Sequence, residues 1–528
     1  MDRGERGERY RRDGHWRRET LPARAAAIAS AGGDRPALSE DGRSFVYGEL
    51  HELIERLAGH LAHMGVEPGD VVSWQLPNWR DAAVIHHAAL RAGAIPNPVN
   101  PIFRGRELRY VLREAKPRVL FVPGVFRRFD HAALAGRLRG EGLVEHVVTV
   151  RAATAPAIAL DDLLSQPADP APTPLVRPSD PALLLYTSGT TSNPKGVLHS
   201  HETLLYEIDS LRRVHAITHD DCYLGGSPVT HIAGLVYGLL MPFAIGTRTA
   251  LLERWDAGRA LELIASERAT FQTGAPTFLQ MLSEHPSLRK HDLSSFRLFS
   301  TGGANIPTEM IRAAEATLGC TVKRAYGSTE VPTLTATAFE DPEELRLGTD
   351  GRAIDPAEIR IAAPDGSPLK AREEGEIWAR SPEVFIGYRN AELDRDAFTD
   401  EGWFRTGDLG RLDDAGYLRV TGRLKDIIIR GGENISVKEV EDLLAEHPAV
   451  ADVAIVGMPD PVLGERACAF VAPRKGATLT FEEMTAFLMS REIARQKFPE
   501  RLELKAKLPK TASGKVLKQA LRAELERG

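Results

Sequence analysis

Residues 183–201 read LLLYTSGTTSNPKGVLHSH, an apolar run followed by a loop of hydroxylated residues and glycines with one lysine. This layout predicts a strand ending in a phosphate-binding loop, because hydroxyls and closely approaching backbone N–H groups can surround an anion while Lys195 supplies a cation. The common P-loop needs Gly-Lys-Ser/Thr at the start of a helix, whereas here Lys195 precedes Gly196 and Val197. The stretch therefore favours a site for a polyphosphate ligand and disfavours the P-loop of a simple NTPase. A plain Ser/Thr/Gly surface loop is the alternative.

The composition of the chain is that of a large globular protein. Its 528 residues predict roughly three to four domain-sized units. With a net charge of -6 we expect no nucleic-acid partner. No run reaches the ~20 apolar residues of a membrane span, so we expect no transmembrane segment. Three widely separated cysteines, Cys222, Cys320 and Cys468, predict free thiols and a cytoplasmic location.

Around the loop, helix and strand signals alternate along the chain. Apolar residues recur at helical spacing over 50–61, and a strand signal follows from Val71. The alternation continues with helices near 81–92 and 131–139 and strands near 119–122 and 146–150. Such alternation is typical of layered α/β sheets.

The sequence divides into three expected parts. Residues 1–20, crowded with charges, predict a disordered or loosely docked arm. Residues 21–424 predict a large N-terminal domain of layered α/β sheets with a β-rich subdomain over 358–421. Residues 425–528 have the size of a small independent α/β domain. The predicted fold class is therefore α/β.

Six motifs in a fixed order carry a resemblance to a known family. Besides the phosphate loop they are residues 326–330 (YGSTE), 406–408 (TGD), 422–426 (GRLKD), 431–435 (GGENI) and 509–515 (PKTASGK). From about residue 20 onward the chain resembles the AMP-forming acyl-CoA synthetases of the acyl-adenylate-forming superfamily. Residues 75–79 (QLPNW) and 97–101 (NPVNP) are similar to bacterial ligases for medium-chain or alicyclic acids, such as cyclohexanecarboxylate–CoA ligase.

The resemblance implies an ATP site that suits the chemistry of carboxylate activation. Activation requires stabilising negative charge on an α-phosphorus and a departing pyrophosphate, for which lysine, hydroxyls and Mg²⁺ are suitable. Thr329 and Glu330 are implied to be catalytic, with Glu330 as the Mg²⁺ ligand, although either could be a surface residue. The implied ATP- and AMP-binding residues are Thr187, Ser188, Gly189, Thr190, Thr191, Lys195, Gly303, Ala304, Asn305, Tyr326, Gly327, Asp408 and Arg423.

The family's reaction has two steps, and the resemblance implies both. The acid first attacks ATP, giving acyl-AMP and pyrophosphate, and CoA then takes the acyl group and releases AMP. Lys515 would bridge the substrate carboxylate and the α-phosphate in the first step. Lys425 would be the hinge about which the mobile small domain rotates before the second. Gly431, Gly432 and Glu433 would bind CoA.

The acyl pocket is expected to be apolar. Residues 227–234 (SPVTHIAG) lack the Asp of amino-acid activators and the Asn of hydroxybenzoate activators in the resembling families. His231 is implied to close the pocket before adenylation, with an ordinary structural histidine as the alternative. The expected lining is Val229, His231, Ile232, Gly234, Val236, Gly303, Ala304 and Gly327. We expect a hydrophobic aliphatic, alicyclic or bulky polycyclic acid, of the kind used in fatty acid metabolism or natural-product biosynthesis.

Two other functions stay open at this point. The thiol acceptor could be an acyl carrier protein instead of CoA, because the acceptor changes without altering the ATP site. The chain could also be a non-catalytic binding descendant, which the retained charged residues disfavour. The sequence leaves open whether the protein is a homodimer.

Overall fold

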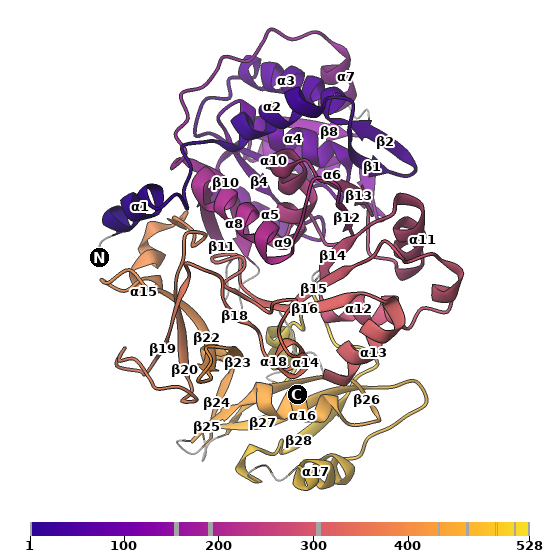
Figure 1. The fold of residues 1–528 in the computed structure, drawn as a ribbon, viewed down its shortest axis with the longest axis vertical. Coiled ribbons are helices and arrows are strands. Elements are labelled where there is room, and N and C mark those ends of the chain that lie inside the picture. The colour runs from indigo at the N-terminus through magenta and orange to yellow at the C-terminus, as the bar shows by residue number, and fades with distance from the viewer. Residues whose placement is uncertain are drawn as a thin grey trace.

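In the computed structural model, most of the N-terminal sheets and helices lie in the upper part of the view and the C-terminal elements at its base (Figure 1). The residues that it describes are 3–152, 158–187, 194–302, 308–430, 433–460, 464–491, 493, 495–511 and 514–525. Among them, no helix has the length and apolarity needed to cross a membrane.

Among the described residues, a nine-stranded sheet forms the centre of the large part of the chain, which is the part that precedes the C-terminal sheet. In spatial order its strands are β18 (Arg352–Ala353), β17 (Thr335–Ala336), β16 (Thr321–Tyr326), β15 (Leu298–Gly302), β14 (Phe271–Gly274), β12 (Cys222–Gly225), β13 (Arg248–Leu251), β1 (Pro36–Glu40) and β2 (Arg43–Val46). The strands from β1 to β16 in this order pair in parallel, and the outer pairs are antiparallel. Parallel strands bring their carboxyl ends to one edge, where α/β proteins bind ligands.

Smaller sheets complete the large part. A parallel sheet runs in the order β4 (Ile95–Pro98), β3 (Val71–Trp74), β5 (Pro117–Pro123), β8 (His146–Val150) and β9 (Ile158–Ala159). An antiparallel sheet consists of β10 (Pro181–Thr187), β11 (Lys195–Ser200) and β21 (Gly387–Tyr388). The β-rich subdomain predicted over 358–421 contains β19 (Glu358–Ala362), β20 (Gly375–Arg380), β22 (Phe404–Leu412) and β23 (Leu418–Arg423). A short hairpin joins β6 (Val125–Phe126) to β7 (Phe129–Asp130).

Helices cover these sheets and connect their strands. They are α2 (Leu21–Gly32), α3 (Tyr47–His63), α4 (Arg80–Arg91), α5 (Gly105–Ala115), α6 (His131–Gly140), α7 (Leu160–Ser165), α8 (His201–Val214), α9 (Ile232–Leu235), α10 (Met241–Ile245), α11 (Ala257–Glu267), α12 (Pro276–Ser283), α13 (Thr308–Leu318), α14 (Glu343–Gly348) and α15 (Asp394–Ala397). Between α9 and α10 lies a π-helical segment, η1 (Val236–Leu240). The predicted alternation over 50–150 is confirmed, because α3, β3, α4, β5, α6 and β8 follow one another in that order.

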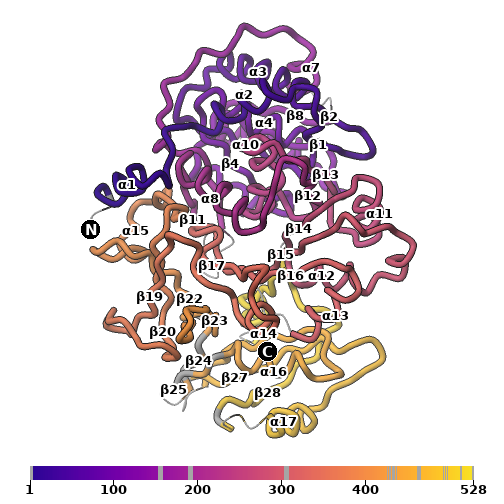
Figure 2. The backbone as a smooth tube through the Cα atoms, viewed as in Figure 1, coloured from indigo at the N-terminus to yellow at the C-terminus, as the bar shows by residue number. Residues whose placement is uncertain are grey.

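The C-terminal part has its own sheet. It consists of β25 (Glu433–Ser436), β24 (Ile427–Arg430), β27 (Gly464–Pro473), β26 (Val450–Asp460) and β28 (Arg501–Leu504). The accompanying helices are α16 (Val437–Ala445), α17 (Phe481–Ser490) and α18 (Lys518–Leu525). Figures 1 and 2 show this yellow and orange part at the base of the view, below the nine-stranded sheet. The division of the chain at 424 and 425 stays a prediction.

The N-terminal arm differs from the sequence prediction. Instead of a disordered or loosely docked arm over 1–20, residues 3–12 form α1 (Arg3–Arg12), beside α15 and α8 in Figure 1. Tyr10 is buried, Arg11 Nε donates to Glu202 Oε1 at 2.8 Å, and Trp16 Nε1 donates to the Pro382 carbonyl at 3.0 Å. The prediction failed because two aromatic residues and one buried ion-pair partner supply long-range contacts that the local charge pattern does not reveal.

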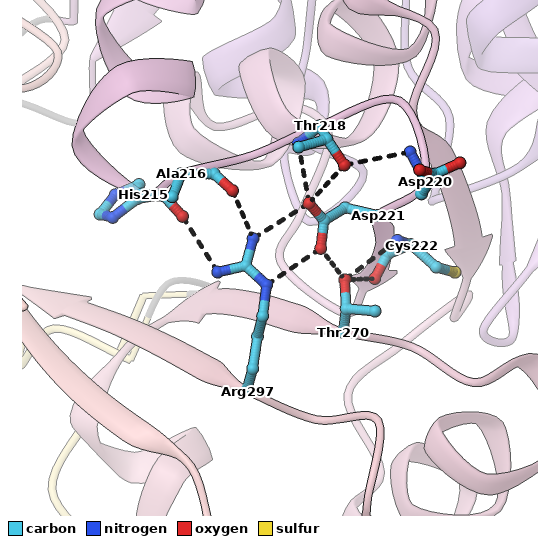
Figure 3. Close-up of polar contacts among 8 residues, drawn as sticks. All are labelled: His215, Ala216, Thr218, Asp220, Asp221, Cys222, Thr270 and Arg297. Atoms are coloured by element: carbon cyan, nitrogen blue, oxygen red, sulfur yellow. Dashed lines mark hydrogen bonds and ion pairs between the residues drawn. The ribbon is translucent and has the colours of Figure 1, made fainter.

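A polar network fixes α8 relative to the nine-stranded sheet (Figure 3). Arg297 donates to both oxygens of Asp221, at 3.1 and 3.0 Å, and to the carbonyls of His215 and Ala216 just after α8, both at 3.0 Å. Thr270 Oγ1 donates to the other side of Asp221 at 2.7 Å. These bonds hold the end of α8 against the start of β12 and β15, and α8 in turn forms one wall of the cavity described next. All three cysteines are free and buried, as predicted.

Candidate active site

One cavity of about 990 Å³ opens between the large part of the chain and the C-terminal part. It is lined by the ends of β10, β11, β14, β15 and β16, by the segment around α9, by β22 and by a loop of the C-terminal part. Its lining includes most of the described residues that the sequence predicts for the site, namely Thr187, Lys195, His231, Ile232, Val236, Tyr326, Gly327, Thr329, Glu330, Asp408, Arg423 and Lys515. Five of the six motifs therefore converge in space at one cavity, whereas the described residues of the 431–435 motif do not line it.

Three side chains join β16, β22 and β23 on one side of the cavity. The Tyr326 hydroxyl donates to Asp408 Oδ2 at 2.8 Å, and Arg423 Nε lies 2.9 Å from Asp408 Oδ1. A positive φ of 73° at Gly407 makes the turn that presents Asp408, and the Gly407 N–H donates to Glu376 Oε1 at 3.1 Å. The charge of Asp408 raises the pKa of Arg423. Each Asp408 oxygen keeps a second lone pair for a ligand hydroxyl.

A second polar group lies where β11 pairs with β21. The Tyr388 hydroxyl donates to Glu330 Oε1 at 3.0 Å, and Lys195 Nζ lies 4.7 Å from the centre of the Tyr388 ring. His199 Nε2 lies 2.8 Å from the Thr329 carbonyl oxygen and anchors the segment that carries Glu330. Lys195 and Glu330 thus face one space from two strands, with Tyr388 between them.

The donor set suits a Mg²⁺ ion that is held together with substrate phosphates. No group of three or more His, Cys, Asp and Glu side chains able to hold a metal occurs in the described parts of the chain. Mg²⁺ is commonly held by one or two carboxylates plus phosphate oxygens, which a single Glu330 carboxylate beside a polyphosphate would provide.

The C-terminal part reaches the cavity through one loop. The Thr511 N–H donates to the Lys515 carbonyl at 2.7 Å, which closes the loop and presents Lys515. A Cβ on Gly514 would lie 3.3 Å from Thr277 Oγ1, so the loop lies directly against the start of α12.

The electrostatic setting of Lys515 links it to the rest of the cavity. Burial, and next the charge of Arg423, lower its pKa to about 8, while Asp408 and Glu330 act in the opposite direction. Burial, and next the charge of Lys515, lower the pKa of His231 to about 4. Lys515 is therefore mostly protonated at neutral pH, and His231 is neutral.

The acyl side of the cavity departs from the predicted lining at two positions. Ile232 and Val236 line it as predicted, but Val229 is packed in the core behind the wall. Gly234 is also outside the lining, because it sits against the Pro228 carbonyl, 2.1 Å from where a Cβ would lie. The sequence pattern does not reveal these two positions, because they are set by packing against the core and against the Pro228 carbonyl.

Several predicted residues fall where the structure gives no description. Ser188, Gly189, Thr190, Thr191, Gly303, Ala304, Asn305, Gly431 and Gly432 lie outside the described residues. Lys425 and Glu433 are described by their backbone only, in η4 (Leu424–Asp426) and at the start of β25.

The sequence did not indicate several polar residues of the lining. Among them are Glu207 on α8, Tyr237 on η1, Thr333 after β16 and Tyr388 on β21. Glu207 and Tyr237 are buried within apolar stretches, where the only available signal is a polar residue at a core-facing helical position.

Comparison with known proteins agrees with this geometry. The family described as AMP-binding enzyme matches residues 25–389, more than half of the chain, and AMP-binding enzyme C-terminal domain matches residues 439–515. The chain belongs to the AMP-binding enzyme family. The resemblance to AMP-forming acyl-CoA synthetases is thereby confirmed, and the protein is an acid–thiol ligase of that kind.

Relatives of this ligase match over nearly its full length. Medium-chain fatty-acid–CoA ligase of Escherichia coli (strain K12) is 34% identical over 98% of this chain and 92% of its own length. Indoleacetate–CoA ligase of Aromatoleum aromaticum is 36% identical over 91% of this chain and 93% of its own. The crystal structure of ATP-bound MatB from Rhodopseudomonas palustris matches with a TM-score of 0.85 at 29% identity, covering 96% of this chain and 99% of that one. The predicted fold class is confirmed.

Proposed function

We propose that this ligase joins a hydrophobic aliphatic, alicyclic or bulky polycyclic acid to CoA in an ATP- and Mg²⁺-dependent reaction. The observation that carries the proposal is the position of Lys515, which enters the same cavity as His231, Glu330, Asp408 and Arg423. A cation next to both the nucleotide-facing carboxylates and the apolar wall suits a lysine that holds the attacking acid against the α-phosphate.

In the first step a carboxylate oxygen of the acid attacks the α-phosphorus of ATP, and pyrophosphate leaves. Lys515 neutralises charge on the acid and the phosphate as the new bond forms. Asp408 and Arg423 hold the ribose, Tyr326 packs against the adenine, and Lys195 faces the leaving pyrophosphate. Glu330 would hold Mg²⁺, which would supply positive charge to the phosphate oxygens.

In the second step the CoA thiol attacks the acyl carbonyl, and AMP leaves with the oxygen that came from the acid. The thiol needs an approach that the Lys515 loop covers while it lies against Ala275 and Thr277. We infer that the C-terminal part rotates about Lys425 between the steps, which withdraws Lys515 and brings residues 431–433 to the site. His231, neutral and next to Lys515, is suited to open the path for the thiol.

The test is a screen for acid-dependent ATP–pyrophosphate exchange over short, medium, long, alicyclic, aromatic and polycyclic acids, followed by mass detection of the CoA thioester. Exchange with thioester formation on a hydrophobic acid supports the proposal. Absence of exchange with every acid would contradict it and favour a non-catalytic descendant.

A carrier-protein acceptor is the second candidate. Its support is that relatives of 34% and 36% identity include a 2,3-dihydroxybenzoate-AMP ligase of Bacillus subtilis (strain 168) and Triostin synthetase I of Streptomyces triostinicus. In the same screen, acid-dependent exchange without any CoA thioester would favour this candidate.

A further inference from the structure

Glu207 is a buried acid on the wall of the cavity that the proposed mechanism does not use. It lies in the middle of α8, and its side chain is 1% exposed. It lines the cavity together with Thr333 and Tyr237. The residues that act on its pKa are Glu383 and Thr333. Those that act on the pKa of Lys515 are Arg423, Asp408 and Glu330, so the two groups share none of these partners.

The hydrogen bonds of Glu207 account for one of its two oxygens. Thr333 Oγ1 donates to Oε1 at 2.7 Å, whereas Oε2 has no hydrogen-bond partner in the described parts of the chain. A buried polar atom without a partner costs roughly 1–3 kcal/mol, so such atoms in native proteins generally have a ligand, a water or a functional reason.

Among the described residues, the charge that acts on Glu207 is that of Glu383, and no balancing cation acts on it. Burial, and next the charge of Glu383, raise the pKa of Glu207 above its usual range. Glu383 is also buried, accepts a hydrogen bond from the Ser381 hydroxyl, and does not line the cavity. The alternative explanation of the buried Glu207 carboxyl is that the two acids share a proton and no ligand binds there. The two acids differ in position, because of the two only Glu207 lines the cavity.

Thr333 and Tyr237 add two hydroxyl groups to the cavity wall near Glu207. Around them the acyl wall carries Ile232, Ala233 and Val236. A few convergent polar groups on an apolar wall are the usual arrangement that orients a small ligand.

We propose that Glu207, Thr333 and Tyr237 form a polar subsite in the acyl half of the cavity that binds a hydroxyl group on the acid substrate. This inference rests on the proposed function and narrows it to hydrophobic acids that carry a hydroxyl away from the reacting carboxyl. A hydroxyl fits because it can donate to Glu207 as a carboxylate or accept from Glu207 as an acid. An ammonium group would fit only the ionised form, and therefore serves as a separate arm of the test.

The experiment measures kcat/KM in acid-dependent ATP–pyrophosphate exchange for matched sets of acids on one carbon skeleton: the parent, its hydroxylated forms and its amino forms. The skeletons are linear medium-chain, cyclohexane and fused-ring acids. The enzymes are the wild type, Glu207→Leu, Glu207→Gln and the matched control Glu383→Gln. Leu and Gln both approximate the volume of Glu, and Gln keeps hydrogen-bonding capacity if Leu fails to fold.

The wild type is expected to prefer a hydroxylated acid over its parent. In Glu207→Leu this preference should fall by roughly 10- to 100-fold, because a site built to bond a hydroxyl discriminates through its buried partner. The parent acid and the KM for ATP should be little affected, and Glu383→Gln should keep the preference of the wild type.

Three results would overturn the inference. One is that no hydroxylated acid is preferred over its parent while exchange with parent acids is present, which leaves the proposed function standing. The second is an unchanged preference in both Glu207 variants, or equal loss in Glu383→Gln, as expected of a structural acid pair. The third is a preference for the amino form. Absence of exchange with every acid is a distinct result, since it removes the proposed function itself.

Discussion

The nucleotide half and the acyl half of the cavity are built on different principles. In the nucleotide half, charged and aromatic side chains already contact one another, as in the chain from Tyr326 through Asp408 to Arg423. In the acyl half, the wall is the apolar face of α9 and η1, and the buried carboxylate of Glu207 has an oxygen without a hydrogen-bond partner among the described residues.

This difference explains which properties are general and which are specific to this ligase. Contacts between fixed charges hold the ATP-facing groups in position before any substrate binds, which is what electrostatic preorganisation requires. On our proposal, the acyl half discriminates by shape and by the polar subsite at Glu207, so changes there should alter the preferred acid without altering the use of ATP.

The largest effect on activity is expected from Lys515→Ala, which removes the cation between the nucleotide half and the acyl half. Acid-dependent pyrophosphate exchange should fall by roughly 10²–10³-fold, because a preorganised cation is lost from the first step. Conversion of supplied acyl-AMP and CoA to thioester should be kept. Lys510→Ala is the control in the same loop, since Lys510 Nζ is engaged with Asp452 at 2.7 Å. Equal loss of both steps in Lys515→Ala would contradict the assigned role.

Val236→Phe should change the preference among acids without changing the use of ATP. A larger side chain on the cavity wall should lower kcat/KM for wide acids by roughly 10–200-fold relative to short ones, while the KM for ATP stays unchanged. Val229→Ile is the control behind the wall, expected to leave the acid range intact. A parallel rise in the KM for ATP would show that the halves are not separable.

Asp408→Asn should weaken the use of ATP without changing the preference among acids. The amide presents a donor where Arg423 and the ribose both need an acceptor, so the KM for ATP should rise by roughly 10- to 100-fold. The order of preference among acids should not change. Steady-state kinetics with two acids of different size test this, and a reordered preference would argue against separate halves.

The pH dependence should report on the group that lies between the halves. The pKa of Lys515 is about 8, so the protonated form needed for the first step is present below pH 8 and is lost as the pH rises through that value. Exchange measured as kcat/KM should therefore decline above pH 8. Lys515→Arg should shift the decline to higher pH, because arginine stays charged. An unshifted decline in Lys515→Arg would assign it to another group.

The smallest effect on catalysis is expected from Arg11→Ala, which touches neither half. Removing its bond to buried Glu202 should lower the free energy of unfolding by about 1–3 kcal/mol, with both KM values unchanged. Arg12→Ala is the matched control, because Arg12 is 73% exposed and should have little effect. Chemical denaturation measures the difference, and equal stability of the two variants would show that docking of α1 contributes nothing.

The sequence predicted the nucleotide half better than the acyl half. Asp408 and Lys515 lie in short motifs that resemble those of a known family, and this resemblance, rather than local spacing, predicted their place in the site. Glu207 and Tyr237 line the cavity because of the way in which elements distant in the sequence pack around them. No local pattern distinguishes them from core residues. The departure of Val229 and Gly234 from the predicted lining has a similar origin, because Val229 packs in the core and Gly234 lies against the Pro228 carbonyl.

The same contrast holds for the fold. Alternating elements over 50–150 follow from hydrophobic periodicity, and α3 through β8 lie where the pattern predicts them. Helix α1 does not, because its stability depends on Glu202 and on the Pro382 carbonyl, far away in the sequence.

The central claim, that one cavity first joins the acid to AMP and then passes it to the thiol, is tested most directly by oxygen transfer. An acid identified by the exchange screen, labelled with ¹⁸O in its carboxyl group, is incubated with ATP, Mg²⁺ and CoA, and the products are analysed by mass spectrometry. The account predicts one ¹⁸O in AMP and none in pyrophosphate. Label in inorganic phosphate together with ADP, or AMP free of label, would contradict it.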